Sequence, residues 1–337
     1  MKSVIAALLL ACAAVAGAES VDVGSIRQNL FATCFASDQE GWMAGELGRI
    51  FRTTDGGATW TQQDAHTKRP FLAMSCLDAK TAWIAGKEGI VYATKDGGIT
   101  WTQLQTGSQR HVFALEFPTA QRGHGAGDYG TMIHTEDGGA TWTVSRVAED
   151  VKLPESALDT GVEPGDVNLY GISFGDPDHV WQVGEFGVVL ASDDGGHTWR
   201  QQTTPVESTL FGVRFSDAQH GIAVGLDSVI LRTADGGATW SPVPPPVQGR
   251  SLFDVFVRGQ QGWIVGDQGT VLKSTDGGAT WKTEPLPLQL AANWIRSVWL
   301  ASGGRGLAVG SEGLVFRVDG SNLTQLGSRA ASPTRTS

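Results

Sequence analysis

The sequence is short of basic side chains, cysteines and long apolar runs, and each shortage excludes a class of protein. Its 337 residues include 25 Lys and Arg against 35 Asp and Glu, a formal net charge of −10. Proteins that bind nucleic acid normally carry a basic stripe, so we expect no nucleic-acid partner. Beyond the N-terminus no apolar run approaches the about 18 residues of a membrane-spanning helix, so we expect no stable membrane insertion. Apolar residues still make up 41% of the chain, enough for a sizeable core.

The N-terminus resembles an export signal. Lys2 provides a positive start, residues 4–11 are apolar, and Ala16-Gly17-Ala18 has the small-x-small form of a cleavage site. We therefore expect residues 1–18 to be a signal peptide. We expect the mature chain to be exported, to the periplasm or, in a phototroph, to the thylakoid lumen. A second interpretation is a lipoprotein signal with Cys12 lipidated, although Leu9-Leu10-Ala11 before it fits that pattern poorly. Removing residues 1–18 takes away one lysine and no acid, which makes the mature charge −11.

Two cysteines, Cys34 and Cys76, remain in the predicted mature chain. An exported pair suggests a disulfide. The repeat described below, however, places the two residues one position out of step, so they should point to opposite faces of neighbouring strands. The prediction is therefore two free, buried thiols.

An internal repeat dominates the rest of the chain. The pattern [ST]-x-D-G-G-x-T-W occurs six times, with its Asp residues 41 apart except for one interval of 57. A Gly precedes each of these Asp residues by ten positions, and in five of the six units another Gly follows three positions later. A seventh unit begins at Gly310, but its box has decayed to Asp319-Gly320-Ser321-Asn322. The six complete boxes contain the residues Asp55, Asp96, Asp137, Asp194, Asp235 and Asp276 with Trp60, Trp101, Trp142, Trp199, Trp240 and Trp281.

Each repeat unit reads as four short strands. In the fifth unit, alternating apolar residues predict strands at 210–215, 221–225, 229–233 and from Thr239 onward, joined by tight turns. A four-stranded meander of about 40 residues matches one propeller blade. We therefore predict an all-β, seven-bladed β-propeller over residues 30–326. A segment at 19–29 could add a closing strand, and residues 327–337 form a tail expected to be disordered.

The boxes are expected to be structural. Glycines allow positive φ in the turn, the Asp carboxylate can accept backbone N–H groups, and the Trp ring packs over the blade. Ten of the twelve Trp residues occupy repeat positions, and Trp294 and Trp299 do not.

With its Gly-x-x-Gly turn, apolar strand and T-x-D-G-G-x-T-W box, the repeat resembles the Asp-box (BNR) repeat of the photosystem II stability/assembly factor family. The resemblance covers residues 30 to about 320. It implies an exported seven-bladed propeller that acts without catalysis as a scaffold, assembly or stability factor for a membrane complex. It further implies a monomer with a protein client, a membrane or envelope protein. Phototroph members carry an arginine patch that has no residue-by-residue match here. Arg52, Arg232 and Arg317 recur before the boxes, where strand alternation alone explains them.

Two other functions stay open: an Asp-box glycoside hydrolase of the sialidase kind, and a carbohydrate- or envelope-binding module. A sialidase resemblance implies a Tyr nucleophile, and of the three tyrosines only Tyr170 could face the central channel. A carboxylate pair would come from acids such as Glu116 and Asp254. The seven His residues lack metal-binding spacings, and no Gly-rich segment has a nucleotide-binding context. We expect no catalytic residues, cofactor or metal.

Each predicted turn between strands two and three of a blade carries an acid. In a propeller blade this turn lies on the same ring face as the links between blades, opposite the boxes, and so do the extra residues within 143–168. Such a face would attract a basic partner, although acids beside Gly also simply suit exposed turns. The predicted partner-binding acids are Glu46, Glu88, Asp128, Glu185, Asp227, Asp267 and Glu312.

Overall fold

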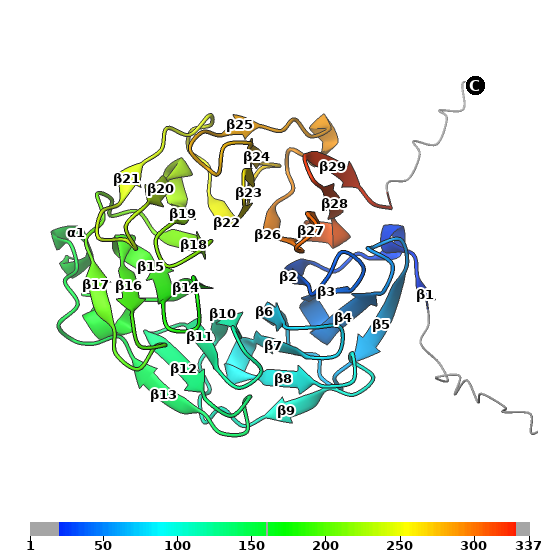
Figure 1. Ribbon diagram of the computed structural model, residues 1–337, viewed down its shortest axis with the longest axis horizontal. Helices are drawn as coiled ribbons and strands as arrows, with labels where there is room; N and C mark the ends of the chain where they lie inside the picture. The colour runs from blue at the N-terminus through cyan, green and yellow to red at the C-terminus, as the bar shows by residue number, and fades with distance from the viewer. Residues whose placement is uncertain (1–19, 160, 328–337) are drawn as a thin grey trace, which may run out of the picture.

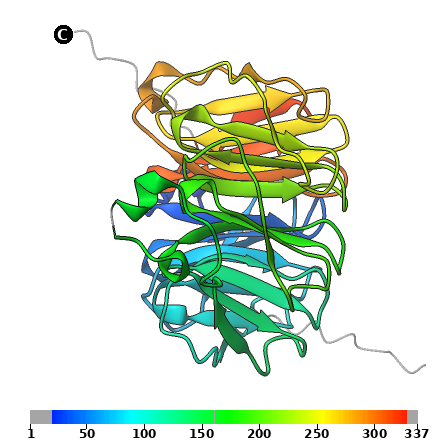
Figure 2. The same ribbon diagram turned by 90° about the vertical axis from the view of Figure 1, so that its left-hand side faces the viewer.

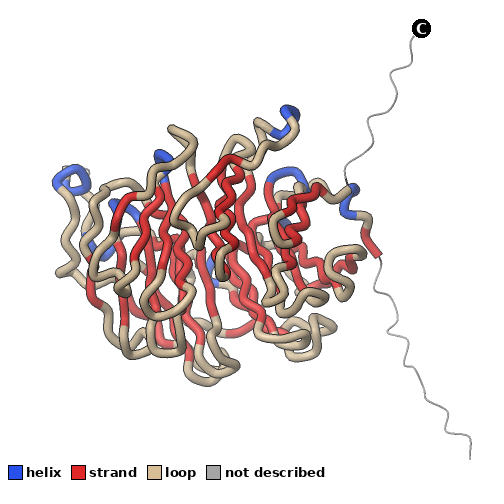
Figure 3. The backbone as a smooth tube through the Cα atoms, turned by 45° about the horizontal axis from the view of Figure 1, so that its top comes forward, coloured by secondary structure: helices blue, strands red, loops and turns tan. Residues whose placement is uncertain are grey.

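The computed structural model describes residues 20–159 and 161–327, which form a ring of seven antiparallel sheets around a central channel (Figure 1). The predicted seven-bladed β-propeller is confirmed, including the seventh blade with its decayed box. The predicted signal peptide at 1–18, Cys12 and the tail beyond Gly327 lie outside the described residues. Strands make up most of the ring and the helices are single turns (Figure 3).

Within each blade the chain runs outward from the channel, so that the strands fall into four concentric sets. The inner strands are β2 (Leu30–Phe35), β6 (Phe71–Cys76), β10 (Val112–Glu116), β14 (Leu169–Phe174), β18 (Leu210–Phe215), β22 (Leu252–Arg258) and β26 (Ile295–Leu300). The second strands are β3 (Gly41–Gly45), β7 (Ala82–Gly86), β11 (Gly123–Gly127), β15 (Val180–Gly184), β19 (Gly221–Gly225), β23 (Gln261–Gly266) and β27 (Arg305–Gly310). The third strands are β4 (Arg49–Thr53), β8 (Val91–Thr94), β12 (Thr131–Thr135), β16 (Val189–Ser192), β20 (Ile230–Thr233), β24 (Val271–Ser274) and β28 (Val315–Asp319). The outer strands are β5 (Trp60–Asp64), β9 (Thr102–Leu104), β13 (Thr143–Arg146), β17 (Arg200–Gln202), β21 (Ser241–Pro242), β25 (Lys282–Thr283) and β29 (Asn322–Gln325).

The helical segments are all short. One α-helical turn, α1 (Glu155–Leu158), lies in the insertion between blades 3 and 4, on the outside of the ring (Figure 2). The 3₁₀ turns are η1 (Val23–Ser25), η2 (Glu46–Gly48), η3 (Lys87–Gly89), η4 (Pro164–Asp166), η5 (Glu185–Gly187), η6 (Leu226–Ser228), η7 (Leu288–Leu290) and η8 (Ser311–Gly313). None of the helices in the described ranges is long and apolar enough to cross a bilayer.

The ring has two distinct faces. On the link face, the turn after each second strand bonds to the residue just before the inner strand of its own blade, as Glu46 N donates to Asn29 O at 2.9 Å. The links between blades therefore lie beside these turns. On the opposite side, the box face, each Asp box bonds to the turn between the first two strands, as Gly56 N donates to Gln39 O at 2.9 Å.

Each Asp box is a closed set of hydrogen bonds. In the first box, Asp55 Oδ1 accepts from the Thr53 hydroxyl at 2.8 Å and from Thr59 N at 2.9 Å. Two successive glycines at φ 71° and 86° make the turn, a conformation that other residues rarely adopt. Trp60, 1% exposed, donates from Nε1 to Gly57 O at 3.2 Å. In each of the other five boxes the Asp Oδ1 likewise accepts from the hydroxyl two residues before it.

In blades 2 and 4, a tryptophan on the second strand is hydrogen-bonded to the Asp box of the next blade. Trp83 Nε1 in blade 2 donates to Gly138 O in the box of blade 3 at 3.1 Å, and Trp181 Nε1 in blade 4 donates to Gly236 O in blade 5 at 3.1 Å. This contact accounts for the Trp at that repeat position in blades 2 and 4. In blade 1, Trp42 Nε1 instead donates to Gln63 Oε1 of its own blade at 3.2 Å.

The prediction of two free thiols is wrong, because Cys34 and Cys76 form a disulfide with Cα atoms 6.0 Å apart. The two residues are one position out of step and do point to opposite faces of their own sheets. Adjacent blades, however, pack face against face, so opposite faces of neighbouring blades look toward each other. The same two positions meet in the next blade pair, where Ser75 Oγ accepts from Phe117 N at 3.0 Å.

The ring closes by packing rather than by a shared strand. In the described part of the chain, blade 7 is built from its own β26 to β29, and β1 (Ser20–Val21) pairs with β5 on the outer edge of blade 1. The two tryptophans outside the repeat act at this junction. Trp299 Nε1 donates to Phe35 O at 3.1 Å, and Trp294 stacks on Phe31 with ring centroids 5.7 Å apart.

Candidate functional site

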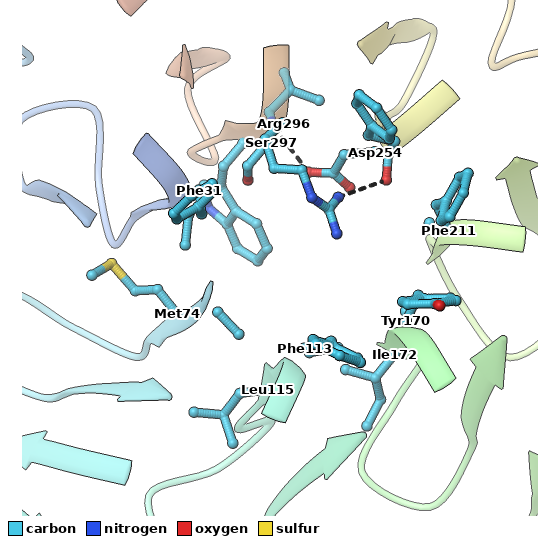
Figure 4. A pocket seen from close by; sticks show the side chains of 18 of the residues that line it. Phe31, Met74, Phe113, Leu115, Tyr170, Ile172, Phe211, Asp254, Arg296 and Ser297 are labelled. Carbon is cyan, nitrogen blue, oxygen red and sulfur yellow. Dashed lines mark hydrogen bonds between the residues drawn. The ribbon is translucent and has the colours of Figure 1, made fainter. Parts of the chain in front are cut away.

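The inner strands of all seven blades surround a central channel with a cavity of about 120 Å³ (Figure 4). The residues around it come from the second to fifth positions of the inner strands, and every blade contributes. The channel is therefore a place where residues far apart in the sequence are brought into a common site by the ring itself.

The second residue of each inner strand is turned toward the mouth of this channel on the link face. At this position every inner strand has a register shift against the second strand, for example between Leu210 and Gly212 in β18. Such a bulge leaves one residue unpaired and re-aims its side chain. All seven are half-exposed. We call them the mouth ring: Phe31, Leu72, Phe113, Tyr170, Phe211, Phe253 and Arg296.

The mouth ring is a continuous aromatic arc over blades 3 to 6. Ring centroids lie 5.3 Å apart for Phe113 and Tyr170, and 5.4 Å for Tyr170 and Phe211. Phe253 follows at 5.7 Å, and the Arg296 guanidinium lies 5.5 Å from the Phe253 ring centroid. Figure 4 shows Phe113, Tyr170 and Phe211 side by side along the channel wall. Large, half-exposed aromatic rings of this kind are the usual anchors of protein interfaces.

Deeper in the channel the charged groups are used by the fold. Glu116 lies 3.5 Å from Arg214 and accepts from Phe174 N at 3.2 Å. Asp254 accepts from Val298 N at 2.9 Å. Burial raises the pKa of both carboxyls, while Arg214 opposes the rise at Glu116. Both acids therefore bond to the backbone of the next blade, one on β10 and one on β22.

The hydroxyl of Tyr170 is not set up as a nucleophile. It donates to Glu185 Oε1 at 3.2 Å, and burial together with the Glu185 charge raises the pKa of the phenol to about 12. The prediction that Tyr170 faces the channel is confirmed by its place in the lining. Its environment favours the neutral phenol, which suits stacking rather than attack.

The opposite mouth, on the box face, has a different chemistry. The guanidinium of Arg214 lies between Phe256 and Trp299, at 4.5 and 4.6 Å from their ring centroids. The Arg258 guanidinium lies 5.6 Å from the Phe256 centroid. The channel thus has a row of aromatic rings at its link-face mouth and, toward the box face, two arginines packed against aromatic rings.

The seven predicted partner-binding acids all lie in the turns of the link face, but they divide into two kinds. Glu46 and Glu185 are of the first kind, directly after the second strand. Glu46 accepts from the backbone N and the side-chain Nδ2 of Asn29, and Glu185 accepts from the same two nitrogens of Asn168. Asp128 and Asp267 occupy the same turn position and are also only half-exposed. Glu46 and Glu185 therefore support the links between blades.

The remaining three acids, Glu88, Asp227 and Glu312, occupy the second position of their turns and are exposed. Their backbone has φ of 59°, 57° and 54°, which holds the side chains away from the blade. Only Glu88 of these has an ion pair in the described structure, to the exposed Arg69 at 2.7 Å. A charge available to a partner is therefore concentrated in this second set.

The arginines at the position before the boxes serve the fold, at least in blade 1. Arg52 pairs with Glu40 at 2.9 Å and donates to the backbone oxygens of Ala79 and Gly97 in blade 2.

The insertion at 143–168 packs on blade 4, where Lys152 N donates to Gln201 Oε1 at 2.8 Å.

Sequence reasoning missed the mouth ring. The signal was present, since a large residue follows the first apolar residue of every inner strand, but simple alternation assigns it to a blade face. Only the bulge turns it into the channel.

Comparison with known proteins gives a consistent picture. The family model described as photosynthesis system II assembly factor YCF48 matches residues 12–111, 198–267 and 243–319, well over half of the chain. A search of curated proteins gives no match.

Similar solved structures support the fold. The chain is similar to "YCF48 bound to D1 peptide", with 19% identity, a TM-score of 0.69, and coverage of 89% of this chain and 96% of that one. It is also similar to YCF48 from Cyanidioschyzon merolae, with 19% identity, a TM-score of 0.70, and 88% and 97% coverage. A GH74 xyloglucanase from Xanthomonas campestris matches with 14% identity and a TM-score of 0.69, over 92% of this chain but 56% of that enzyme. Identities this low show the fold alone.

Proposed function

The chain belongs to the photosystem II assembly factor YCF48 family, and we propose that it is an exported, non-enzymatic scaffold that holds a protein client while a membrane complex is assembled. The family match supports the role. A similar structure contains YCF48 bound to a D1 peptide, which supports the proposal that this chain also binds its client through a peptide segment. The client proposed here is a segment of a membrane or envelope protein, held by a single ring.

The mouth ring is the observation that carries this proposal. It offers four aromatic side chains in series, Phe113, Tyr170, Phe211 and Phe253, with centroid separations of 5.3 to 5.7 Å. A peptide laid across it can bury apolar side chains between these rings, and Trp, Tyr and Arg typically dominate such interfaces. The cavity beneath is about 120 Å³, which is enough for a side chain of the bound segment.

The charges on the link face indicate which kind of client segment would bind. The exposed acids Glu88, Asp227 and Glu312 surround the mouth ring on the link face. Opposite charges around an apolar centre steer association and exclude like-charged partners. We therefore propose a client segment with apolar side chains at its centre and Lys or Arg at its flanks.

Export to the periplasm or the thylakoid lumen is part of the proposal. The residues at 1–18 have the pattern of a signal peptide. The disulfide between Cys34 and Cys76 supports the same compartment independently, because disulfides persist in exported proteins and are rare in reducing cytosol.

A hydrolase is the less supported alternative. An acid–base pair needs two carboxyls free to act on one bond, whereas Glu116 and Asp254 each bond to a backbone N–H of the next blade. The similarity to the xyloglucanase extends only to the fold.

Affinity capture from the native envelope tests the proposal. The mature protein, its F211A/Y170A variant and its R258A variant would be used as baits at low and at high salt, with membranes solubilised in mild detergent. We expect the same membrane-protein client with the unchanged protein and with R258A, lost at high salt and lost in F211A/Y170A.

Three results would count against it. Capture that survives F211A/Y170A would remove the mouth ring from the site. Capture lost only in R258A would move the site to the box face. Recovery of glycans or cell-wall material alone would favour the carbohydrate- or envelope-binding alternative.

A further inference from the structure

The junction between blades 3 and 4 departs from the repeat in three places that carry imidazole. His124 stands where four other blades have a tryptophan, Trp42, Trp83, Trp181 and Trp263. His197 occupies a box position that is alanine in four of the other five boxes. His134 occupies the position of Arg52 and Arg232. His124 and His197 are 73 residues apart in the sequence and need not meet in space, so their meeting here calls for a physical explanation.

The fold brings the three rings into one cluster. His124 on β11 pairs directly with His134 on β12 in the strand register, and their ring centroids lie 5.2 Å apart at an interplanar angle of 11°. The box of blade 4 then places His197 with its centroid 5.5 Å from that of His134. Glu136, at the end of β12, completes the group. One ligand atom from each of His134, Glu136 and His197 can be chosen so that all lie within 4.8 Å of one another.

The ligand groups are already oriented by neighbours. His197 Nδ1 lies 2.7 Å from the backbone oxygen of Asp194, which fixes the proton on Nδ1 and leaves Nε2 as the acceptor. Both oxygens of Glu136 accept from Arg122 Nε, at 3.2 and 3.3 Å, and Arg122 is itself anchored to Pro177 O. An imidazole held through its other nitrogen, and a carboxylate held by a hydrogen bond, are the usual supports around a metal.

The buried member of the cluster, His124, packs on two rings of blade 4, with its centroid 5.6 Å from that of Phe174 and 6.2 Å from that of Trp199. His124 is 1% exposed, and its Nε2 lacks a hydrogen-bond partner in the described structure. It abuts Gly196, where a Cβ would come within 2.1 Å of the ring. A tryptophan here would serve the blade-to-blade contact, as it does in blades 2 and 4. The smaller imidazole instead supports His134 from behind, as a positioning residue.

We propose that His134, His197 and Glu136 bind a divalent first-row transition metal ion, with Zn²⁺ or Co²⁺ as the test ion. Two imidazoles and one carboxylate suit zinc, cobalt, nickel or iron rather than calcium or magnesium, which prefer oxygen ligands. Bonds of about 2.0–2.2 Å require ligand atoms about 3.3–3.6 Å apart in a tetrahedral arrangement, so small side-chain rotations complete the site.

The site faces an open groove of about 500 Å³ between the two blades, bordered by Val151, Leu190 and Trp199. His134 and His197 line this groove, and the insertion between blades 3 and 4 forms part of its wall through Ala148 and Asp150. Three protein ligands leave at least one position open toward the groove, where water or a group from another molecule can bind. This site lies on the outside of the ring and does not depend on the mouth ring.

The repeat itself supplies well-matched variants. H197A creates the box residue of blades 1, 3, 5 and 6, and H134R creates the residue of blades 1 and 5, so both should fold. H220A is the control, because His220 is an exposed imidazole 3.0 Å from Asp217 but has no second histidine in the same cluster. The mature protein, prepared without a histidine tag, would be titrated with Zn²⁺ by calorimetry and with Co²⁺ by absorption spectroscopy.

We expect one equivalent of metal bound by the unchanged protein and by H220A. In H197A and H134R the affinity should fall by about 10-fold or more. The Co²⁺ spectrum should be lost in both, and metal should raise the melting temperature only where it binds. Absence of binding by the unchanged protein at millimolar metal would overturn the proposal. So would binding that H197A and H134R leave unchanged, because the ion would then lie elsewhere.

Discussion

On the box face, the carboxylate of each Asp box accepts from a hydroxyl and a backbone N–H of its own turn, as Asp55 does from Thr53 and Thr59. On the link face, the aromatic side chains of the mouth ring are half-exposed, and the acids at the second turn position extend into solvent. The repeat sets the Asp and Trp of the box on the first face, whereas on the second it sets the Gly-x-x-Gly turn and not the residues of the mouth ring. The contrast indicates that the repeated residues stabilise the fold, and that the residues for function lie where the fold constrains the sequence less.

A box tryptophan and a mouth-ring phenylalanine show the same contrast in burial. Trp60 is 1% exposed and bonded to its box, whereas Phe211 touches other ring members and the channel. A buried ring contributes mainly to stability and a half-exposed one mainly to binding. Substitutions on the two faces should therefore separate stability from client binding.

The largest expected effect is the loss of a box tryptophan. Trp60→Ala removes a ring that is almost fully buried and should lower the free energy of unfolding by about 4 kcal/mol. Phe211→Ala on the link face should cost far less, about 1 kcal/mol, because its ring is half-exposed. Urea denaturation followed by Trp fluorescence measures both. Equal losses for the two variants would remove the distinction between the faces.

Removing the disulfide should have the next largest effect. The bond joins residues 42 positions apart in blades 1 and 2. The free energy of unfolding of the C34S/C76S variant should therefore be about 3 kcal/mol lower. Reduction of the unchanged protein should give the same loss. Client capture at a temperature where the variant stays folded should not change, since neither cysteine lies in the mouth ring.

Acid should weaken the box face before it affects the mouth ring. Hydrogen bonds from Thr141 and Thr135 lower the pKa of Asp137 to about 2, and bonds from Thr280 and Ser274 do the same for Asp276. A carboxyl whose folded pKa is depressed stabilises the fold above its unfolded pKa of about 4, and this stabilisation is lost as the pH falls toward 2. Thermal melts between pH 5 and 2 should therefore show a falling midpoint. Asp276→Asn should flatten that slope, and a slope identical to that of the unchanged protein would contradict the account.

The smallest effect on stability is expected at the exposed acids. D227K/E312K reverses two charges held away from the blade, and the free energy of unfolding should change by no more than about 0.5 kcal/mol. Client binding at low salt should nevertheless weaken, and the difference should vanish at high salt as charges are screened. Glu46 and Glu185 are unsuitable for this test, because they hold the links through Asn29 and Asn168.

The fold could be predicted from the sequence because the box repeats. The spacing of Asp55 and its counterparts defines the blades, and their four strands follow from apolar alternation. The relation between blades could not be predicted in the same way. The disulfide was missed because alternation describes one sheet, whereas Cys34 and Cys76 meet across two sheets packed face to face.

The candidate sites were harder to predict for the same reason. Phe211 and its counterparts look like ordinary strand residues until the bulge turns them into the channel. His134 and His197 are 63 residues apart and show no motif, and they meet only because blades 3 and 4 are neighbours. Trp294 and Trp299, which stood outside the repeat, proved to close the ring.

Site-specific photocrosslinking tests the central claim most directly. A photoreactive amino acid would replace Phe211 in the mouth ring in one variant and the exposed Ala279 of a box in another, both expressed in the native host. The account predicts a crosslinked membrane or envelope protein from position 211 and none from position 279. A client crosslinked from position 279 but not from 211 would contradict it, and would place the docking surface on the box face.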